Sequence, residues 1–357
     1  MKKFFYLAVA ACAALAACSK NEVVSVTPDQ EITYQTISTK AASAMETDKK
    51  FVSYAYFLPQ GKNWGGNFND ASPYISAATI GYNATANAWK ADKTYYWPKQ
   101  GSLTFFAWST NNATPSLDPT PTCSAAKGIE VATFDITANK DVDFLVAEIA
   151  QDKTANTTTV DGKAWKAGVP TVFKHALSKL DFNVMTVDET GAAKDYSSEN
   201  ITFTVLSVNL KSVKNKMGYR QNWNNASGNS THDWYDIDAT TAHIEVPVFS
   251  GPAQEATKTE TALAPGEYGY SIVIPQIFDS ADNTEDLLEI KYAITTSYAG
   301  TPVKETVTQT VKLSTVYPNN WEVNKHYTLT IKLGVKEIFW APTVEEWEIG
   351  TTTAVQF

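Results

Sequence analysis

Four histidines are the side chains in this sequence best suited to acid–base catalysis or metal binding, and they are scattered along the chain: His175, His232, His243 and His326. Their spacing matches no zinc site, and the sequence has no Gly-x-Ser-x-Gly, His-Glu-x-x-His or phosphate-binding glycine loop. We expect His175 to be a hydrogen-bonded structural residue, because it directly precedes an alternating strand pattern. The sequence therefore predicts a protein that is not an enzyme and holds no resident cofactor or metal.

Two acidic stretches, residues 232–238 and 279–286, are the other groups of side chains that could bind a cation. Neither fits the ligand spacing of an EF-hand. We expect solvated loops there, with weak Ca²⁺ binding as the alternative. Cys123 lies between the polar stretches "DPTPT" and "SAAKG", which indicates a loop thiol without an assigned role.

Cys18 has a sequence context that predicts chemical modification. A lysine pair and a short apolar run precede it, and polar residues follow it at once. The run is shorter than the roughly 20 residues that a membrane-spanning helix needs, so the pattern is typical of a signal peptide. The motif "LAAC" resembles the lipobox of bacterial lipoproteins, which implies a signal peptide over 1–17, acylation of Cys18 and a tether over 18–30. We expect an outer-membrane lipoprotein exposed at the cell surface.

The composition limits the partners and the means of stabilisation. Without residues 1–17 the chain carries 27 basic and 38 acidic side chains, a net charge near −11, which argues against binding nucleic acid. Once Cys18 is acylated, Cys123 is the one remaining thiol, so no internal disulfide can form. The fold must therefore be held by its hydrophobic cores.

Alternation of apolar and polar residues with period two dominates the sequence, as in "YTLTIKL" (327–333) and "KLDFNV" (179–184). In residues 201–210 the apolar phase slips by one position, which predicts a β-bulge. Residues 95–109 read as a hairpin that turns at Pro98–Gly101. The fold class is predicted to be all-β, with tandem antiparallel β-sandwiches and few short helices.

The polar segment 151–170 gives the best domain break. We predict an N-terminal β-sandwich domain over 31–168 and a C-terminal β-sandwich domain over 169–357, which includes a C-terminal tail at 334–357. The polar segment 222–236 is expected to be a long loop.

Several of these pieces together resemble the fimbrillin family, the subunit lipoproteins of donor-strand pili in Bacteroidales. The pieces occur in family-like order over nearly the whole mature chain: "LAACSKNE", "EITYQTISTKAA", "FVSYAYFLPQG", "YYWPKQGSLTFFAWS", "VDFLVA", "FKHALSKLDFNV", "YSIVIPQ", "NKHYTLTIKL" and "VEEWEIG". The resemblance implies two transthyretin-like β-sandwich domains in tandem, export as a lipoprotein, and polymerisation by strand donation with other fimbrial subunits.

The resemblance also implies a role for the first strand. In the precursor, residues 31–39 would fill a groove of the first sandwich, with Ile32, Tyr34 and Thr36 on one face. Proteolysis would remove this strand, and a strand from the next subunit would take its place by β-strand addition.

The processing site is a difficulty, because the best-known members of the family are cut after an arginine. Arg220 is the only arginine here, and the sequence places it deep in the second domain. We predict cleavage at Lys40, Lys49 or Lys50 by a protease that accepts lysine, or else no cleavage. An uncleaved subunit would be an anchor or a terminal cap.

The tail at 334–357 has two interpretations: part of it is the donated strand, or it is a final edge hairpin packed on its own domain. A rival function is also open. A surface lipoprotein could bind host glycans on exposed aromatic side chains, for which the sequence offers Trp64, Trp89, Trp223 and Trp234. Host glycans or proteins are expected partners under either function, through adhesion.

Overall fold

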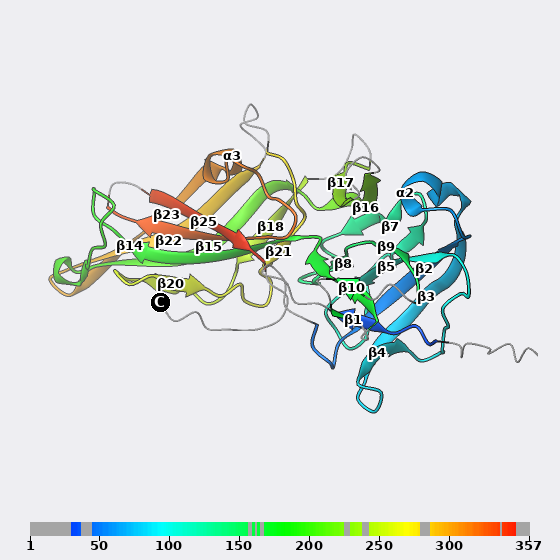
Figure 1. Cartoon of the computed structure of the whole chain (residues 1–357). Helices are drawn as coiled ribbons and strands as arrows, with labels where there is room; N and C mark the ends of the chain where they lie inside the picture. The colour runs from blue at the N-terminus through cyan, green and yellow to red at the C-terminus, as the bar shows by residue number, and fades with distance from the viewer. Residues whose placement is uncertain are drawn as a thin grey trace, which may run out of the picture.

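The computed structural model describes residues 30–36, 45–155, 159–160, 163–164, 168–224, 229–237, 243–278, 286–335 and 338–347. Strands dominate, and the α-helices in this part of the chain are four residues long. None of the described helices is long and apolar enough to cross a membrane. The predicted all-β class with few short helices is confirmed (Figure 1).

The first half of the chain contains β1 (Tyr34–Thr36), β2 (Lys50–Leu58), α2 (Trp64–Asn67), η1 (Phe68–Asp70), β3 (Ser72–Asn83), β4 (Ala88–Ala91), β5 (Ser102–Ser109), β6 (Thr122–Ser124), β7 (Gly128–Asp135), β8 (Leu145–Ala147), β9 (Ala150–Lys153), β10 (Thr159–Val160), β11 (Lys163–Ala164), β12 (Val169–Thr171) and β13 (Phe173–His175). The second half contains β14 (Ser178–Thr186), η2 (Ser197–Glu199), β15 (Ile201–Lys214), β16 (Lys216–Asn224), β17 (Asn229–Tyr235), β18 (His243–Phe249), β19 (Gln254–Ala256), β20 (Thr261–Leu263), β21 (Ile272–Val273), β22 (Leu287–Tyr298), β23 (Thr301–Lys312), α3 (Leu313–Val316), β24 (Lys325–Leu333) and β25 (Ile338–Glu346).

The main sheet of the first half has the order β12-β1-β4-β3-β2-β5-β8-β13, with β9 also paired to β5. Its end strands β12 and β13 are separated by a single residue, Val172, so the sheet curls until its two ends meet. Every residue of β5 is buried, because one face of this strand points into the curled sheet and the other faces a second sheet. A strand covered on both faces reads as a continuous apolar run, as "LTFFAW" does.

The second sheet of the first sandwich has the order β17-β16-β7-β6 and is built partly from the second half of the chain. The β16–β17 hairpin leaves the second sandwich and pairs with β7 (Figure 1). The prediction of a loop over 222–236 is wrong, since the described residues of this segment lie mostly in these two strands. Arg220, expected deep in the second domain, lies on β16 opposite Glu130 of the first.

The second sandwich packs β20-β14-β24-β25 against β18-β15-β22-β23, with β21 and β19 as short additions. The β-bulge predicted within 201–210 is confirmed by a register shift between Val205 and Ser207. Antiparallel pairing was expected throughout, but β14 and β24 run parallel over eight residues, from Lys179 to Thr186. Within residues 268–274, only the two residues of β21 form a strand of the second sandwich.

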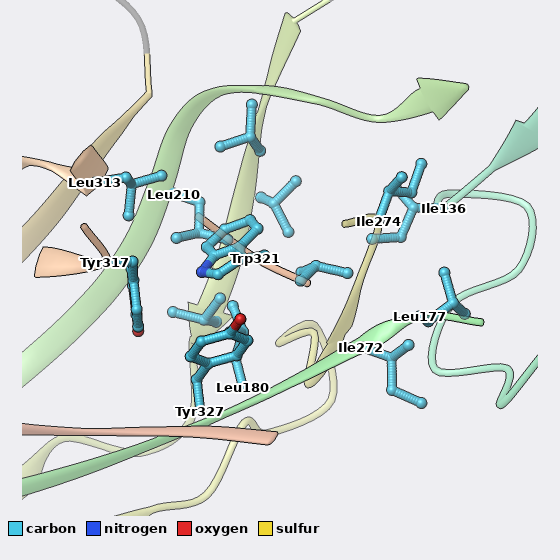
Figure 2. Close-up of a cluster of buried hydrophobic side chains, with 14 of the residues drawn as sticks. Ile136, Leu177, Leu180, Leu210, Ile272, Ile274, Leu313, Tyr317, Trp321 and Tyr327 are labelled. Atoms are coloured by element: carbon cyan, nitrogen blue, oxygen red, sulfur yellow. The ribbon is translucent and has the colours of Figure 1, made fainter. Parts of the chain in front are cut away.

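The hydrophobic core passes without a break from one sandwich to the other. In Figure 2, Ile136, which directly follows β7, is drawn next to Ile274 of the second half, and both belong to the same cluster of buried side chains. The β16–β17 hairpin adds Tyr219, which is fully buried with its ring centroid 5.1 Å from that of Phe144. The two sandwiches are therefore joined by a shared core as well as by shared strands.

The hairpin predicts a stability effect that crosses the sandwich boundary. Tyr219→Ala removes a buried ring between the two sheets of the first sandwich, so we expect a loss of about 3–5 kcal/mol in the free energy of unfolding. Tyr268→Ala, at a tyrosine that is 65% exposed, is the matched control and should change it by less than about 0.5 kcal/mol. Chemical denaturation measures both values. Equal effects of the two substitutions would contradict this description of the hairpin.

Candidate functional site

The strand β1 is inserted between two other strands of the curled sheet. It runs parallel to β12 on one side, with Tyr34 opposite Val169, and antiparallel to β4 on the other, with Tyr34 opposite Trp89. The Val169 amide donates to the Thr33 carbonyl at 2.7 Å. Both edges of this short strand are therefore occupied, which makes it an inner strand of the curled sheet.

The residues just before β1 pair with a third segment. The Ile32 amide donates to the Tyr95 carbonyl at 2.8 Å, and the Trp97 amide donates to the Gln30 carbonyl at 2.9 Å. Residues 95–97 were predicted to be the first arm of a hairpin with β5, and this was wrong. The backbone groups of residues 95–97 pair with residues 30–32 instead. Residues 30–32 therefore take the position that the hairpin prediction gave to β5.

The side chains of this segment differ in burial from one residue to the next. Ile32 and Tyr34 are each 3% exposed and point into the curled sheet, while Thr33 and Thr36 are half-buried. The Tyr34 ring meets Phe51 and Phe105 edge-on, with ring centroids 5.5 and 5.8 Å away. Ile32 and Tyr34 thus fill the interior of the first sandwich, whereas Thr36 is at its rim.

These two side chains belong to a hydrophobic cluster separate from the shared core. The other members come from nearly every strand of the curled sheet: Met45, Phe51, Ala55, Ile75, Ile80, Trp89, Ala91, Leu103, Phe105, Ala107, Leu145, Ala147, Ala150, Val169 and Phe173. Without β1, this cluster would open to solvent between β12 and β4, and the facing backbone groups of both strands would lose their partners. The result would be an apolar groove with two bare strand edges, which is a template for another strand.

The tyrosine in this groove is imperfectly accommodated. The Tyr34 hydroxyl is buried and makes no hydrogen bond within the described part of the chain. Burial raises the pKa of Tyr34 well above its usual value, and the nearby Ser53 hydroxyl offsets only part of that rise. An unpaired buried hydroxyl costs about 1–3 kcal/mol relative to a paired one.

Gly168 lets the chain approach β1 closely. Its φ of +103° lies outside the range that other residues favour, and a Cβ there would lie 2.4 Å from the Thr33 carbonyl oxygen. The Glu31 carboxylate and the Lys90 ammonium form an ion pair at 3.1 Å across the same rim. Gly168 was not predicted to have a role; its one signal in the sequence is its position directly before "VPTV".

The three lysines predicted as processing sites differ in their surroundings. Lys50 opens β2, its amide donates to the Asn112 carbonyl at 3.0 Å, and the next residue, Phe51, is fully buried. Lys49 ends a turn in which its amide donates to the Glu46 carbonyl, and its ammonium pairs with Asp48 at 3.1 Å. Lys40 lies outside the described residues, as do Cys18 and positions 37–39.

The described part of the predicted tail forms an edge hairpin. β25 pairs with β24 along all nine of its residues. Trp347 then stacks on His175, with ring centroids 3.7 Å apart and planes 3° apart. This arrangement matches the edge-hairpin interpretation for 338–347, while residues 348–357 lie outside the described part.

The other residues considered for chemistry have structural surroundings. His175 is confirmed as a hydrogen-bonded structural residue, with its Nδ1 2.6 Å from Asp143 Oδ1. In the first acidic stretch, Asp233 pairs with Arg220 and Asp236 pairs with Lys214, both at 2.8 Å. The described residues contain no group of three or more His, Cys, Asp or Glu placed to hold a metal ion.

Cys123 was predicted to be a loop thiol, but it lies on the short strand β6. Burial raises the pKa of the Cys123 thiol well above the usual range, so the thiol stays protonated at neutral pH. No role follows from its position.

The tryptophans proposed as a glycan platform do not form one. Trp64 and Trp89 are buried, at 0% and 6% exposure. Trp234 is half-buried, and its indole N–H donates to the Ala176 carbonyl at 2.7 Å. The side chain of Trp223 lies outside the described residues. No described observation therefore favours the glycan-binding function.

Comparisons with known proteins agree with this architecture. Residues 27–347 match the sequence model of a family described as fimbrillin-like. A fimbrial protein from Bacteroides vulgatus has a similar structure, with a TM-score of 0.63 and 16% identity over 89% of this chain and 100% of that chain. A candidate cell adhesion protein from Bacteroides uniformis has a TM-score of 0.46 and 15% identity over 90% of this chain and 100% of that chain. The tip fimbrial protein Mfa3 from Porphyromonas gingivalis, with C-terminal truncation, has a TM-score of 0.41 and 10% identity over 90% of this chain and 100% of that chain. No curated protein matches the chain.

The close approach at Gly168 yields a matched pair of substitutions. Gly168→Ala should destabilise the protein by about 1–3 kcal/mol more than Gly191→Ala, because the added methyl meets the Thr33 carbonyl. Gly191 also has a positive φ, +82°, but its Cβ would meet nothing within 4 Å, so it controls for backbone strain. Thermal or urea denaturation measures the difference. If both variants lose the same stability, β1 is not held as closely as described.

A histidine next to the buried Tyr219 predicts a specific pH dependence. Desolvation, with a smaller contribution from Lys174, lowers the pKa of His232 to about 4, and its Nδ1 lies 2.7 Å from the Tyr219 hydroxyl oxygen. The unfolded chain takes up this proton near pH 6.5, so the histidine contributes a loss of stability as the pH falls from 6.5 toward 4. In His232→Gln, which does not titrate, the urea midpoint should fall less between pH 7 and pH 4.5. An equal fall in both proteins would exclude this role for His232.

Proposed function

The chain belongs to the fimbrillin-like family, and from that premise we propose that it is a structural subunit of a cell-surface fimbria that assembles by exchange of its first β-strand. Adhesion would follow from the assembled fibre, and the direct partners would be other fimbrial subunits. The burial of Ile32 and Tyr34 between β12 and β4 is the observation that supports strand exchange most directly.

A donated strand would need to replace both the packing and the pairing of β1. Burying one aliphatic side chain contributes about 1.5–3 kcal/mol, while association costs about 4–15 kcal/mol. The burial of side chains alone therefore leaves little net free energy of binding for a donated strand. The two ladders, to β12 and to β4, and a slow release from a buried site would supply the durability of the polymer.

Attachment to the outer membrane is a second part of the proposal. Acylation of Cys18 after removal of 1–17 would place the chain on the membrane, with 18–30 as a tether. Each buried methylene of an acyl chain contributes about 0.8 kcal/mol, so several chains would make a stable anchor.

The surroundings of Lys49 and Lys50 support a choice among the three lysines for processing. A protease must draw an extended segment into its own site, so backbone hydrogen bonds and buried neighbours protect a bond from cleavage. The amide of Lys50 is hydrogen-bonded, and Lys49 is held in a turn. We propose cleavage after Lys40, between the last described residue of β1 and Met45. Arg220 is protected, because β16 is paired on both sides by β7 and β17.

The N-terminus of fibre subunits tests this proposal. Fibres extracted from the cell surface should begin at Ala41, and Lys40→Ala should leave the precursor at full length and abolish or strongly reduce polymerisation. Lys49→Ala is the matched control and should be processed normally. N-terminal sequencing and SDS-resistant ladders provide the readouts. Assembled fibres whose subunits start at Cys18 would overturn strand removal and favour an anchor or cap.

A further inference from the structure

The strand β23 of the second sandwich has one edge without a described partner. It pairs with β22 along all 12 of its residues, and no described strand pairs with its other edge. We propose that this edge binds the same edge of a second copy of this chain, in antiparallel orientation and with Val307 opposite Val307. The contact would continue the sheet β18-β15-β22-β23 from one molecule into the other by strand addition.

The other edge strands of the second sandwich have features that discourage strand addition. β20 is only 3 residues long, β18 contains Pro247 and two register shifts against β15, and β25 has Pro342 at its middle. By contrast, β23 pairs with β22 without a register shift, and its one proline, Pro302, is at its second position. Among these four strands, β23 therefore has the edge most open to another strand.

The β22–β23 hairpin determines which backbone groups of β23 point to the free edge. The chain turns through Ala299 and Gly300, which both have positive φ, so Thr301 forms a hydrogen-bonded pair with the residue opposite it on β22. Such pairs recur at every second residue. The Leu313 amide, which donates to the Asp286 carbonyl at 2.7 Å, lies in the same phase. The free edge therefore carries the amides and carbonyls of the intervening residues, which include Lys304, Thr306, Thr308 and Thr310.

One antiparallel register joins these four residues to the same four residues of a second copy. With Val307 at the centre, Thr306 lies opposite Thr308 of the second copy, and Lys304 lies opposite Thr310. Both members of each pair then direct an amide and a carbonyl toward the other strand, as a regular antiparallel ladder requires. The contact is the same on both molecules, so it is closed by a two-fold axis.

The same register matches the side chains by type. Val307 faces its own counterpart, and Val303 faces Val311 of the second copy. Val303 is 66% exposed in the single chain, so pairing would remove apolar surface from water. On the other face, the threonine pairs can form hydrogen bonds between their hydroxyls.

The neighbouring registers are less favourable. Moving the second strand by two residues in one direction sets Lys304 opposite Lys312, and like charges directly opposite each other are destabilising. Moving it by two residues in the other direction sets Val307 opposite Glu305. Neither shift leaves a valine opposite a valine, so the register centred on Val307 is the favoured one of the three.

The contact is expected to be weak between free molecules. A contact between two single strands is smaller than the roughly 1,200–2,000 Å² of a standard interface, so association needs a high protein concentration. An array of subunits would repeat the contact, and multivalency would then strengthen it. This strengthening, unlike the contact itself, rests on the fimbrial function proposed above.

Cross-linking tests the register. The uncleaved full chain is used, so that its result is independent of strand exchange at β1. In Val307→Cys the two new thiols face each other at a Cα separation of about 4.5 Å, within disulfide range. A mild oxidant at millimolar protein should therefore give a disulfide-linked dimer. In Gln309→Cys the two positions are displaced by four residues along the strands, about 13 Å, and no such dimer should form.

The parent chain under the same oxidant accounts for its native thiols. A Val307→Cys chain that forms no more dimer than Gln309→Cys, or than the parent, would overturn the inference.

Charge substitutions test the contact at equilibrium. Thr306→Lys with Thr308→Glu sets opposite charges across the contact, whereas Thr306→Glu with Thr308→Glu sets like charges. Both variants keep the hairpin, because position 308 faces Lys291 on β22. In sedimentation equilibrium the like-charge variant should raise the dissociation constant of the dimer about two- to thirtyfold. The opposite-charge variant should associate at least as tightly as the parent.

A control for net charge is Ala84→Glu with Ala86→Glu, at two exposed positions of the first sandwich, which should associate like the parent. Equal association of the two β23 variants would overturn the register, and a parent chain that stays monomeric at millimolar concentration would overturn the contact. Neither result would bear on strand exchange.

Discussion

A buried β-strand must have backbone partners on both sides, and the first sandwich meets this condition only with a three-residue insert. β12 and β4 each pair with β1, and neither pairs with the other. The inward side chains of β1 close the hydrophobic cluster at the same place. The closure of the curled sheet and the filling of its interior therefore depend on one short segment near the start of the chain. Because that segment is joined to the rest only through 37–44, one cut would separate it from the fold it completes.

The remainder of the molecule packs against the side of the curled sheet opposite the groove. The face of the curled sheet opposite the groove packs on β7 and β16, and β16 comes from the second sandwich. Gln221 links the two sheets, because its side-chain amide donates to the Ala147 carbonyl at 2.7 Å. Asp141 accepts from the Ser271 amide at 2.9 Å, which joins the halves at a second place. A groove backed by a shared core can keep its shape when its strand is exchanged, as a site for strand addition requires.

The sequence predicted the strands in which apolar and polar residues alternate, so that one face is buried. It missed strands whose pairing depends on a segment from another part of the fold. β14 and β24 alternate between apolar and polar residues and were identified, and β15 was identified together with its phase slip. The β16–β17 hairpin was missed because a fully buried residue in β16, Gln221, is polar and interrupts the alternation. Residues 95–97 were assigned to a hairpin because local pairing is the default, yet segment 30–32 takes their hydrogen bonds. Such choices between partners depend on the whole fold, so no single segment reveals them.

The central claim is that β1 leaves its groove when subunits join, and a reversible lock on that strand tests it most directly. Thr36 and Thr171 are paired residues of β1 and β12, so a cysteine at each would tie the strand in place by a disulfide. The processed double variant should stay monomeric when oxidised and form SDS-resistant polymers once a reductant is added, while Thr36→Cys alone should polymerise under both conditions. Polymers that form at the same rate with the disulfide intact would show that β1 stays in its groove, and would contradict the account.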